Sequence, residues 1–243
     1  MESAAIILAA GAGTRMKSDK PKVAHEMLGK PLVNWVIDAA SQAGVNRLVA
    51  VVGHKREQVE PLVAGKAEIV VQVEQRGTAD AVASCREALA DFEGSLLVLS
   101  GDSPLISAKT MHDLIELRER EGAAVVVLTM RPQDPFGYGR IIRDANGQVE
   151  RIVEQKDATP EEAAVGECNS GFYCFDAKAL FDALEKVGSD NAQGEFYLTD
   201  VLEISRKAGR AVLAMPAADD AECLGVNTPE QLAALAEIAQ QRL

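Results

Sequence analysis

The sequence lacks the features of a membrane or secreted protein. It has no run of about eighteen apolar residues, the length that a membrane-spanning helix needs. Met1 to Ser3 lead directly into a strand-like apolar segment, which leaves no room for a signal peptide. We therefore expect a cytoplasmic protein with no membrane partner.

Cysteine is scarce and shows no spacing that indicates chemistry. The 4 cysteines form no C-x-x-C pair, and no histidine lies near them at metal-ligand spacing. This pattern favours buried thiols over metal ligands or disulfides. The residues concerned are Cys85, Cys168, Cys174 and Cys223.

Positive charge is in deficit along the chain as a whole. The 25 Lys and Arg residues stand against 37 Asp and Glu residues, for a formal net charge of −12. This balance argues against a nucleic-acid partner, and we expect none. It also makes one local exception conspicuous, because four cationic side chains fall within residues 15–22: Arg15, Lys17, Lys20 and Lys22.

The segment before this cation cluster has the pattern of a buried strand that ends in a glycine turn. Ala4 to Ala9 form a continuous apolar run, typical of a strand covered on both faces. Gly11 and Gly13 follow, and glycine lets a backbone approach a ligand closely. Peptide N–H groups and positive charge that converge at such a turn indicate an anion site, with phosphates favoured. The alternative is a flexible glycine-rich loop with solvated lysines.

Two well-known phosphate motifs do not fit this turn. A P-loop requires its second glycine to be followed directly by Lys and then Ser or Thr, but Thr14 and Arg15 follow Gly13. A dinucleotide fingerprint requires a third glycine where Met16 stands. Pro21 also indicates that any helix after the turn is short.

Apolar runs of strand length alternate with helix-periodic segments along the chain, which predicts βαβ units. Expected strands are 4–9, 47–52, 69–73, 95–99, 123–130 and 211–214; expected helices are 33–43, 56–64, 78–90, 107–121 and 196–208. Residues 132–175 have a hairpin texture and are expected to form a small β insertion at the sheet edge, with a turn at Asn146-Gly147. The predicted fold is α/β, with a doubly wound, mostly parallel, mixed sheet. The expected domain covers residues 1–228, followed by a C-terminal helix over 229–243.

The opening motif resembles a known family signature. Leu8 to Met16 read LAAGAGTRM and are followed by Pro21-Lys22, which is similar to the signature of sugar-nucleotide pyrophosphorylases. Further matches run to Asn227 and narrow the resemblance to one branch, the uridylyltransferase domain of bacterial N-acetylglucosamine-1-phosphate uridylyltransferases; the match at 190–200 is specific to that branch. These matches lie at 72–78, 101–105, 152–159, 167–171, 190–200 and 224–229.

The resemblance implies a Rossmann-like nucleotidyltransferase fold, an activity and a set of roles. The implied reaction joins UTP and N-acetylglucosamine 1-phosphate and releases pyrophosphate, with Mg²⁺ as cofactor. Asp102 and Asn227 are the implied metal ligands, and Arg15 and Lys22 the catalytic cations. The implied substrate contacts are Leu8, Ala9, Ala10, Gly11, Gly13, Thr14, Lys22, Gln72, Gly77, Thr78, Ser100, Gly101, Asp102, Gly139, Glu154, Asn169 and Asn227.

The chain departs from the family pattern at two positions in this set of motifs. Asp80 stands where the family commonly has histidine, which leaves the contacts after Thr78 open. Ser100 stands where several members have tyrosine near the sugar. The sequence also has no hexapeptide repeat, so we do not expect the acetyltransferase activity of the bifunctional members from this chain.

No general base is needed for this reaction, because the attacking phosphate is already an anion. His25, His54 and His112 lie outside the matching motifs and are expected to be structural. Two other classes remain open: a transferase for another sugar or base, and a non-catalytic sugar-nucleotide sensor. A homo-oligomer also remains open.

Overall fold

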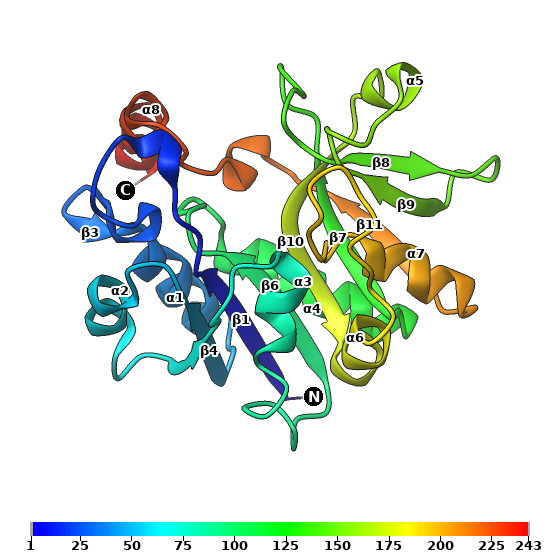
Figure 1. Ribbon diagram of the computed structural model, residues 1–243, viewed down its shortest axis with the longest axis horizontal. Coiled ribbons are helices and arrows are strands. Elements are labelled where there is room, and N and C mark those ends of the chain that lie inside the picture. Colours follow the sequence, from blue (N-terminus) through cyan, green and yellow to red (C-terminus); the bar gives the residue numbers. More distant parts are fainter. Residues whose placement is uncertain (1, 243) are drawn as a thin grey trace.

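A nine-stranded mixed sheet forms the centre of the computed structural model, which describes residues 2–242 (Figure 1). The main strand order is β11-β7-β10-β6-β1-β4-β5, and β8 and β9 extend from β10 as a hairpin. Parallel pairing links β5, β4, β1 and β6, and it also links β7 to β11, whereas β10 is antiparallel to both of its neighbours. The strands are β1 Ser3–Ala9, β4 Arg47–Val52, β5 Glu68–Val71, β6 Ser95–Ser100, β7 Val125–Met130, β8 Arg140–Arg143, β9 Val149–Val153, β10 Cys168–Asp176 and β11 Val212–Pro216, with a separate pair β2 Glu26–Met27 and β3 Lys30–Pro31.

Side-chain alternation along the central strands explains why helices cover both faces of the sheet. In β1, Ala4 and Ile6 enter one core, and Ala5 and Ile7 enter the other; all four are fully buried. Helices α3, α6 and α7 pack on the first face, and α1, α2 and α4 on the second. The α-helices are α1 Leu32–Gln42, α2 Arg56–Val63, α3 Thr78–Ala83, α4 Ala108–Glu121, α5 Pro160–Ala163, α6 Ala177–Leu184, α7 Asp200–Lys207 and α8 Pro229–Arg242, with short 3-10 turns at Thr14–Met16, Lys22–Ala24 and Asp220–Cys223.

The predicted fold class is confirmed by this arrangement, but the predicted β insertion was too wide. Of the expected 132–175 segment, only β8 and β9 form the hairpin beyond the main sheet. Strand β10 instead lies between β7 and β6, inside the sheet. Its nine residues include Gly171 at φ +84° and a register shift between Asn169 and Tyr173, so their local pattern did not mark a central strand.

Two predicted helices were also too long. The backbone groups of residues 196–198 bind elsewhere: Phe196 N–H donates to the Arg76 carbonyl at 2.8 Å, and Leu198 N–H donates to Thr78 Oγ1 at 3.0 Å. Helix α7 therefore begins at Asp200 and not at residue 196. Helix α3 ends at Ala83, and the expected continuation to residue 90 consists of turns.

The C-terminal helix packs against the loop that follows β1 (Figure 1). Leu235 and Ala239 of α8 are buried against Met16 and Met27. This packing holds the start of α8 beside the glycine turn. All four cysteines are free and buried, as predicted. Across residues 2–242, no helix is long and apolar enough to span a bilayer.

Candidate active site

The loop after β1 folds back onto the residues that follow it. Gly13 has φ +61°, and a Cβ at this position would lie 2.5 Å from the Cβ of Lys22, so the turn requires glycine. The N–H of Met16 donates to the Gly13 carbonyl at 3.0 Å and closes the turn. Gly11 has open space where a Cβ would stand, and it borders a pocket. The backbone at Gly11 is therefore accessible to a ligand.

Side chains from distant parts of the chain meet at the carboxyl edge of the sheet. The ammonium of Lys22 contacts the Asp102 carboxylate and donates to Asn227 Oδ1 at 3.1 Å. Arg15 Nη2 donates to the same Oδ1 at 2.8 Å. The two predicted catalytic cations and the two predicted metal ligands therefore form one cluster, which we call the cation–ligand cluster.

Backbone pairing explains how Asp102 and Asn227 come together across 125 positions of sequence. Asp102 lies just beyond β6, and its carbonyl accepts a hydrogen bond from the Val226 N–H at 2.9 Å. Val226 is fully buried, so the segment that carries Asn227 is fixed beside Asp102. A Cβ at Gly225 would lie 3.4 Å from Asp102 Oδ2, so the backbone before Asn227 runs directly beside the Asp102 carboxylate.

A pocket of about 340 Å³ adjoins the cation–ligand cluster. Nine of the predicted site residues line it: Leu8, Ala10, Gly11, Lys22, Gln72, Gly77, Thr78, Ser100 and Asp102. Four further residues line the pocket that were not predicted from the sequence: Val23, Gln75, Ala81 and Glu195. Gln75 and Glu195 lie within the family motifs at 72–78 and 190–200, and this position was the signal by which they could have been predicted as pocket residues.

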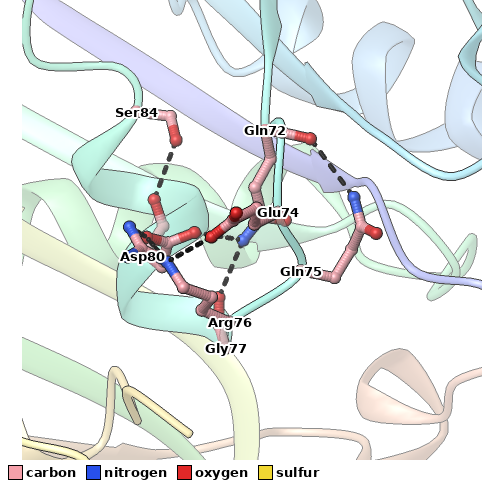
Figure 2. A network of polar contacts seen from close by, with 7 residues as sticks. All are labelled: Gln72, Glu74, Gln75, Arg76, Gly77, Asp80 and Ser84. Carbon is pink, nitrogen blue, oxygen red and sulfur yellow. Dashed lines mark hydrogen bonds and ion pairs between the residues drawn. The ribbon is translucent and has the colours of Figure 1, made fainter.

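The loop after β5 brings its polar side chains into a single network (Figure 2). Gln72 is buried, and its Nε2 donates to the Gly77 carbonyl at 3.1 Å and to Asp80 Oδ2 at 2.9 Å. Gly77 has φ +127°, and a Cβ there would lie 2.4 Å from the carbonyl oxygen of Phe196. The backbone at Phe196 therefore packs directly against this loop.

A second polar cluster brings together three of the implied substrate contacts, Gly139, Glu154 and Asn169. Asn169 N–H donates to the Gly139 carbonyl at 2.8 Å, and a Cβ at Gly139 would lie 3.4 Å from Glu154 Oε1. Thr199 Oγ1 donates to the same Glu154 oxygen at 3.3 Å. Burial raises the pKa of Glu154, and this hydrogen bond opposes the rise. None of the three lines the 340 Å³ pocket.

Of the remaining implied substrate contacts, Ala9 and Gly101 do not line the pocket, and the side chain of Thr14 is not described. The Ala9 side chain is buried in the core, so only its backbone can meet a ligand. Gly101 N–H donates to the Leu8 carbonyl at 3.0 Å and fastens the end of β6 to β1. The side chain of Thr14 is not among the described groups. The substrate and metal roles of all these residues stay predictions.

The oxygen donors at the carboxyl edge of the sheet limit which metal ion could bind there. Among residues 2–242, no group of three or more His, Cys, Asp or Glu side chains could hold one. In the cation–ligand cluster, however, the Asp102 carboxylate and the Asn227 amide oxygen converge on one cationic atom, the Lys22 ammonium. Two hard oxygen donors around a cation suit Mg²⁺, which keeps several waters and shares its coordination with substrate phosphates.

A mixed α/β sheet with an open glycine turn, a cation cluster and a pocket at its carboxyl edge defines a nucleotide-binding domain. Residues 5–203 match the family model of the MobA-like NTP transferase domain. The chain belongs to this family.

Curated relatives are similar over the whole chain but are about twice as long. The bifunctional protein GlmU of Lactobacillus johnsonii is 51% identical over 243 residues, which are 100% of this chain and 53% of the relative. GlmU of Geobacter metallireducens is 50% identical over 242 residues, or 99% of this chain and 51% of the relative. The chain therefore spans about half the length of the curated relatives that it matches.

A solved structure supports the fold assignment. The crystal structure of UDP-glucose pyrophosphorylase complexed with UDP-glucose superposes with a TM-score of 0.79 and 17% sequence identity, and the match covers 100% of both chains. At this identity the similarity establishes the fold.

Proposed function

We propose that this chain is a nucleotidyltransferase that makes UDP-N-acetylglucosamine and pyrophosphate from UTP and N-acetylglucosamine 1-phosphate. The observation that carries the proposal is the cation–ligand cluster, where Arg15 and Lys22 meet Asp102 and Asn227 beside the 340 Å³ pocket. The similarity to GlmU over the full chain supports the choice of substrates.

In the proposed reaction, an oxygen of the sugar phosphate attacks the α-phosphorus of UTP. A new P–O bond forms, the bond to the bridging oxygen of the β-phosphate breaks, and pyrophosphate leaves with that electron pair. The nucleophile is already an anion, so no proton has to be removed. The barrier comes from bringing polyanions together, and positioning plus electrostatics can lower it.

The cluster and the glycine turn beside it can provide these effects through two cationic side chains and through backbone N–H groups. Arg15 is exposed at the rim, where its guanidinium can contact the triphosphate and the charge that develops on the leaving group. Lys22 borders the pocket directly and can contact the phosphates as a compact charge. The open backbone at Gly11 supplies N–H groups for phosphate oxygens.

Asp102 and Asn227 would hold a divalent cation, and we propose Mg²⁺. When bound, this ion neutralises charge on the phosphates and orients them for in-line displacement. Both oxygens already face one cationic atom, the Lys22 ammonium. Asp102 is also held from its backbone by Val226, which fixes the position of its carboxylate.

For the sugar, we propose Glu154 and Asn169 as the groups that bind hydroxyls. Asn169 is itself held, because its Oδ1 accepts from the Gly171 N–H at 3.1 Å and its Nδ2 donates to the Tyr173 hydroxyl at 2.7 Å. The Glu154 carboxylate shares this cluster through Gly139. Asn169 lies in β10 and Glu154 directly follows β9, and bidentate polar groups in such fixed positions suit the recognition of vicinal hydroxyls.

The proposal is tested by pyrophosphate release from UTP, CTP, ATP and GTP, each with N-acetylglucosamine 1-phosphate or glucose 1-phosphate. We expect the fastest release with UTP and N-acetylglucosamine 1-phosphate. Arg15→Ala should lower kcat by ~10²–10³ with the fold intact, since removing one preorganised charge contact typically costs that much. The matched control is Arg56→Ala, because Arg56 pairs with Glu60 on the surface of α2. No release with any pair, or normal turnover in Arg15→Ala, would contradict the proposal.

Three further expectations belong with this proposal. We propose that residues 1–228 act as one transferase domain to which the helix over 229–243 is attached. A cytoplasmic location and a homo-oligomer stay predictions; fractionation of cells and light scattering of the purified protein would test them.

A further inference from the structure

Asp80 is held in place by a neighbouring arginine. Its Oδ1 accepts from Arg76 Nε at 3.1 Å and from Arg76 Nη2 at 2.6 Å (Figure 2). The Asp80 side chain is only 14% exposed, whereas that of Arg76 is 58% exposed. The arginine thus covers the carboxylate from the solvent side and leaves Oδ2 pointing inward to Gln72.

The amide of Gln72 has no donor left for a ligand. One N–H of its Nε2 is used by the Gly77 carbonyl at 3.1 Å and the other by Asp80 Oδ2 at 2.9 Å. Both partners can only accept hydrogen bonds, so a reversed amide would place its oxygen against two other oxygens. The orientation is therefore fixed, and Oε1 is the atom that remains for the pocket, which Gln72 lines.

An acceptor at this point discriminates between the pyrimidine bases. Uracil carries an N–H donor at N3, which an amide oxygen can accept. Cytosine carries a lone pair at N3, which would face that oxygen. An amide side chain can in general both accept and donate hydrogen bonds, and here the network leaves Gln72 only as an acceptor.

We infer that Asp80, anchored by Arg76, is a positioning residue that fixes the Gln72 amide as an acceptor and thereby makes the site prefer UTP over CTP. This inference rests on the proposed function. Asp80 lies in the first turn of α3, where a carboxylate can also stabilise the helix. Its Oδ2, however, binds the Gln72 side chain, so the helix role does not account for this contact.

The test compares wild type with Asp80→Asn and Asp80→Ala, and measures kcat and KM for UTP and for CTP. Asp80→Asn keeps the side-chain shape, and it can turn an N–H₂ toward Gln72, which releases the amide to reverse. The matched control is Glu74→Gln, which removes one negative charge beside the same arginine, at 3.6 Å, without reaching Gln72. Thermal unfolding of each variant monitors the fold.

We expect the UTP/CTP ratio of kcat/KM to fall roughly tenfold in both Asp80 variants, the factor that one net hydrogen bond supplies. The change should lie in KM, with kcat for UTP near that of wild type, because the reacting phosphates are untouched. Glu74→Gln should keep the wild-type ratio. A folded Asp80→Asn protein with an unchanged ratio would overturn the inference while leaving the proposed transferase intact.

Calorimetric titration of UTP and CTP without a sugar phosphate separates the two proposals. If turnover is absent, the proposed function fails, and the inference is then judged on binding alone. Tighter binding of UTP than CTP in wild type, with a reduced difference in Asp80→Ala, supports it. Equal binding of both nucleotides by wild type, or an unreduced difference in Asp80→Ala, refutes it.

Discussion

The most informative single substitution is Lys22→Met, because it should change two measured quantities in opposite directions. Lys22 contacts Asp102 and lies 3.1 Å from Asn227 Oδ1, so its ammonium occupies the space between the two proposed metal ligands. The same ammonium is proposed to serve the phosphates during turnover. Removal of the charge should therefore free the ligands and harm the reaction.

The expected gain in metal affinity follows from the environment of the Lys22–Asp102 ion pair. The Lys22 and Asp102 side chains are 20% and 15% exposed, which places the pair between a surface ion pair and a buried one. Opposite unit charges 4 Å apart attract by ~4 kcal/mol at an effective dielectric constant of 20. Desolvation and lost rotamer freedom leave a net ~1–2 kcal/mol, or a factor of ~5–30 in an equilibrium constant.

We therefore expect Lys22→Met to bind Mg²⁺ ~5–30 times more tightly than wild type without nucleotide. Its kcat should fall ~10²–10³ because a charge contact in the transition state is lost. Calorimetric titration with Mg²⁺ measures the first quantity, and pyrophosphate release measures the second.

The matched control is Lys30→Met, since Lys30 forms a comparable pair with Asp38 at 2.6 Å, outside the pocket. This variant should leave both quantities near wild type. Metal affinity in Lys22→Met that is equal to or weaker than that of wild type would refute the idea that the ammonium competes for the ligands. Normal turnover would refute its role with the phosphates.

Three other predictions concern single side chains. Asp102→Asn should weaken the magnesium dependence of turnover far more than Asp91→Asn, whose residue is 79% exposed; equal magnesium titrations would count against Asp102 as a ligand. Burial raises the pKa of Glu154, so the native state loses stability as pH rises from the unfolded pKa through the folded pKa, and this loss is absent below the unfolded pKa. Glu154→Gln removes the loss and should raise the Tm more at pH 7 than at pH 4. A Tm difference that is the same at both pH values would contradict this prediction. Ser100→Tyr should increase the preference for N-acetylglucosamine 1-phosphate over glucose 1-phosphate by ~10–200-fold in kcat/KM, and an unchanged ratio would remove Ser100 from sugar selection.

The parts of the fold that the sequence predicted are those with strong local patterns. Strand β4 is a continuous apolar run, and the structure has it at the predicted residues, Arg47–Val52. The helices over residues 33–43 and 107–121 were correct to within one residue at either end of α1 and at the start of α4. Each of these elements is specified by its own periodicity, without help from distant segments.

The predictions failed where long-range pairing decides the structure. Strand β10 is antiparallel to two strands whose paired residues precede its own by between 38 positions (Cys168 and Met130) and 81 positions (Asp176 and Ser95), and a glycine at positive φ interrupts its pattern. Residues 196–198 look helical in isolation, but their backbone groups bind the loop at Arg76 and Thr78. No local pattern could report partners that lie so far along the chain.

The same limit applies to the candidate active site, where motifs named the residues but not their contacts. The glycine turn and the aspartate after β6 could be placed at one sheet edge from the order of strands alone. That Lys22 would bridge Asp102 and Asn227 depends on how Val226 and α8 hold the C-terminal segment against the loop. A lysine carries its charge on a flexible four-carbon stem, so the ammonium can leave the carboxylate for a phosphate without backbone movement. In the structure the Lys22 ammonium neutralises the Asp102 carboxylate, and in the proposed reaction the same charge would move to the phosphates once a metal ion is held by Asp102 and Asn227.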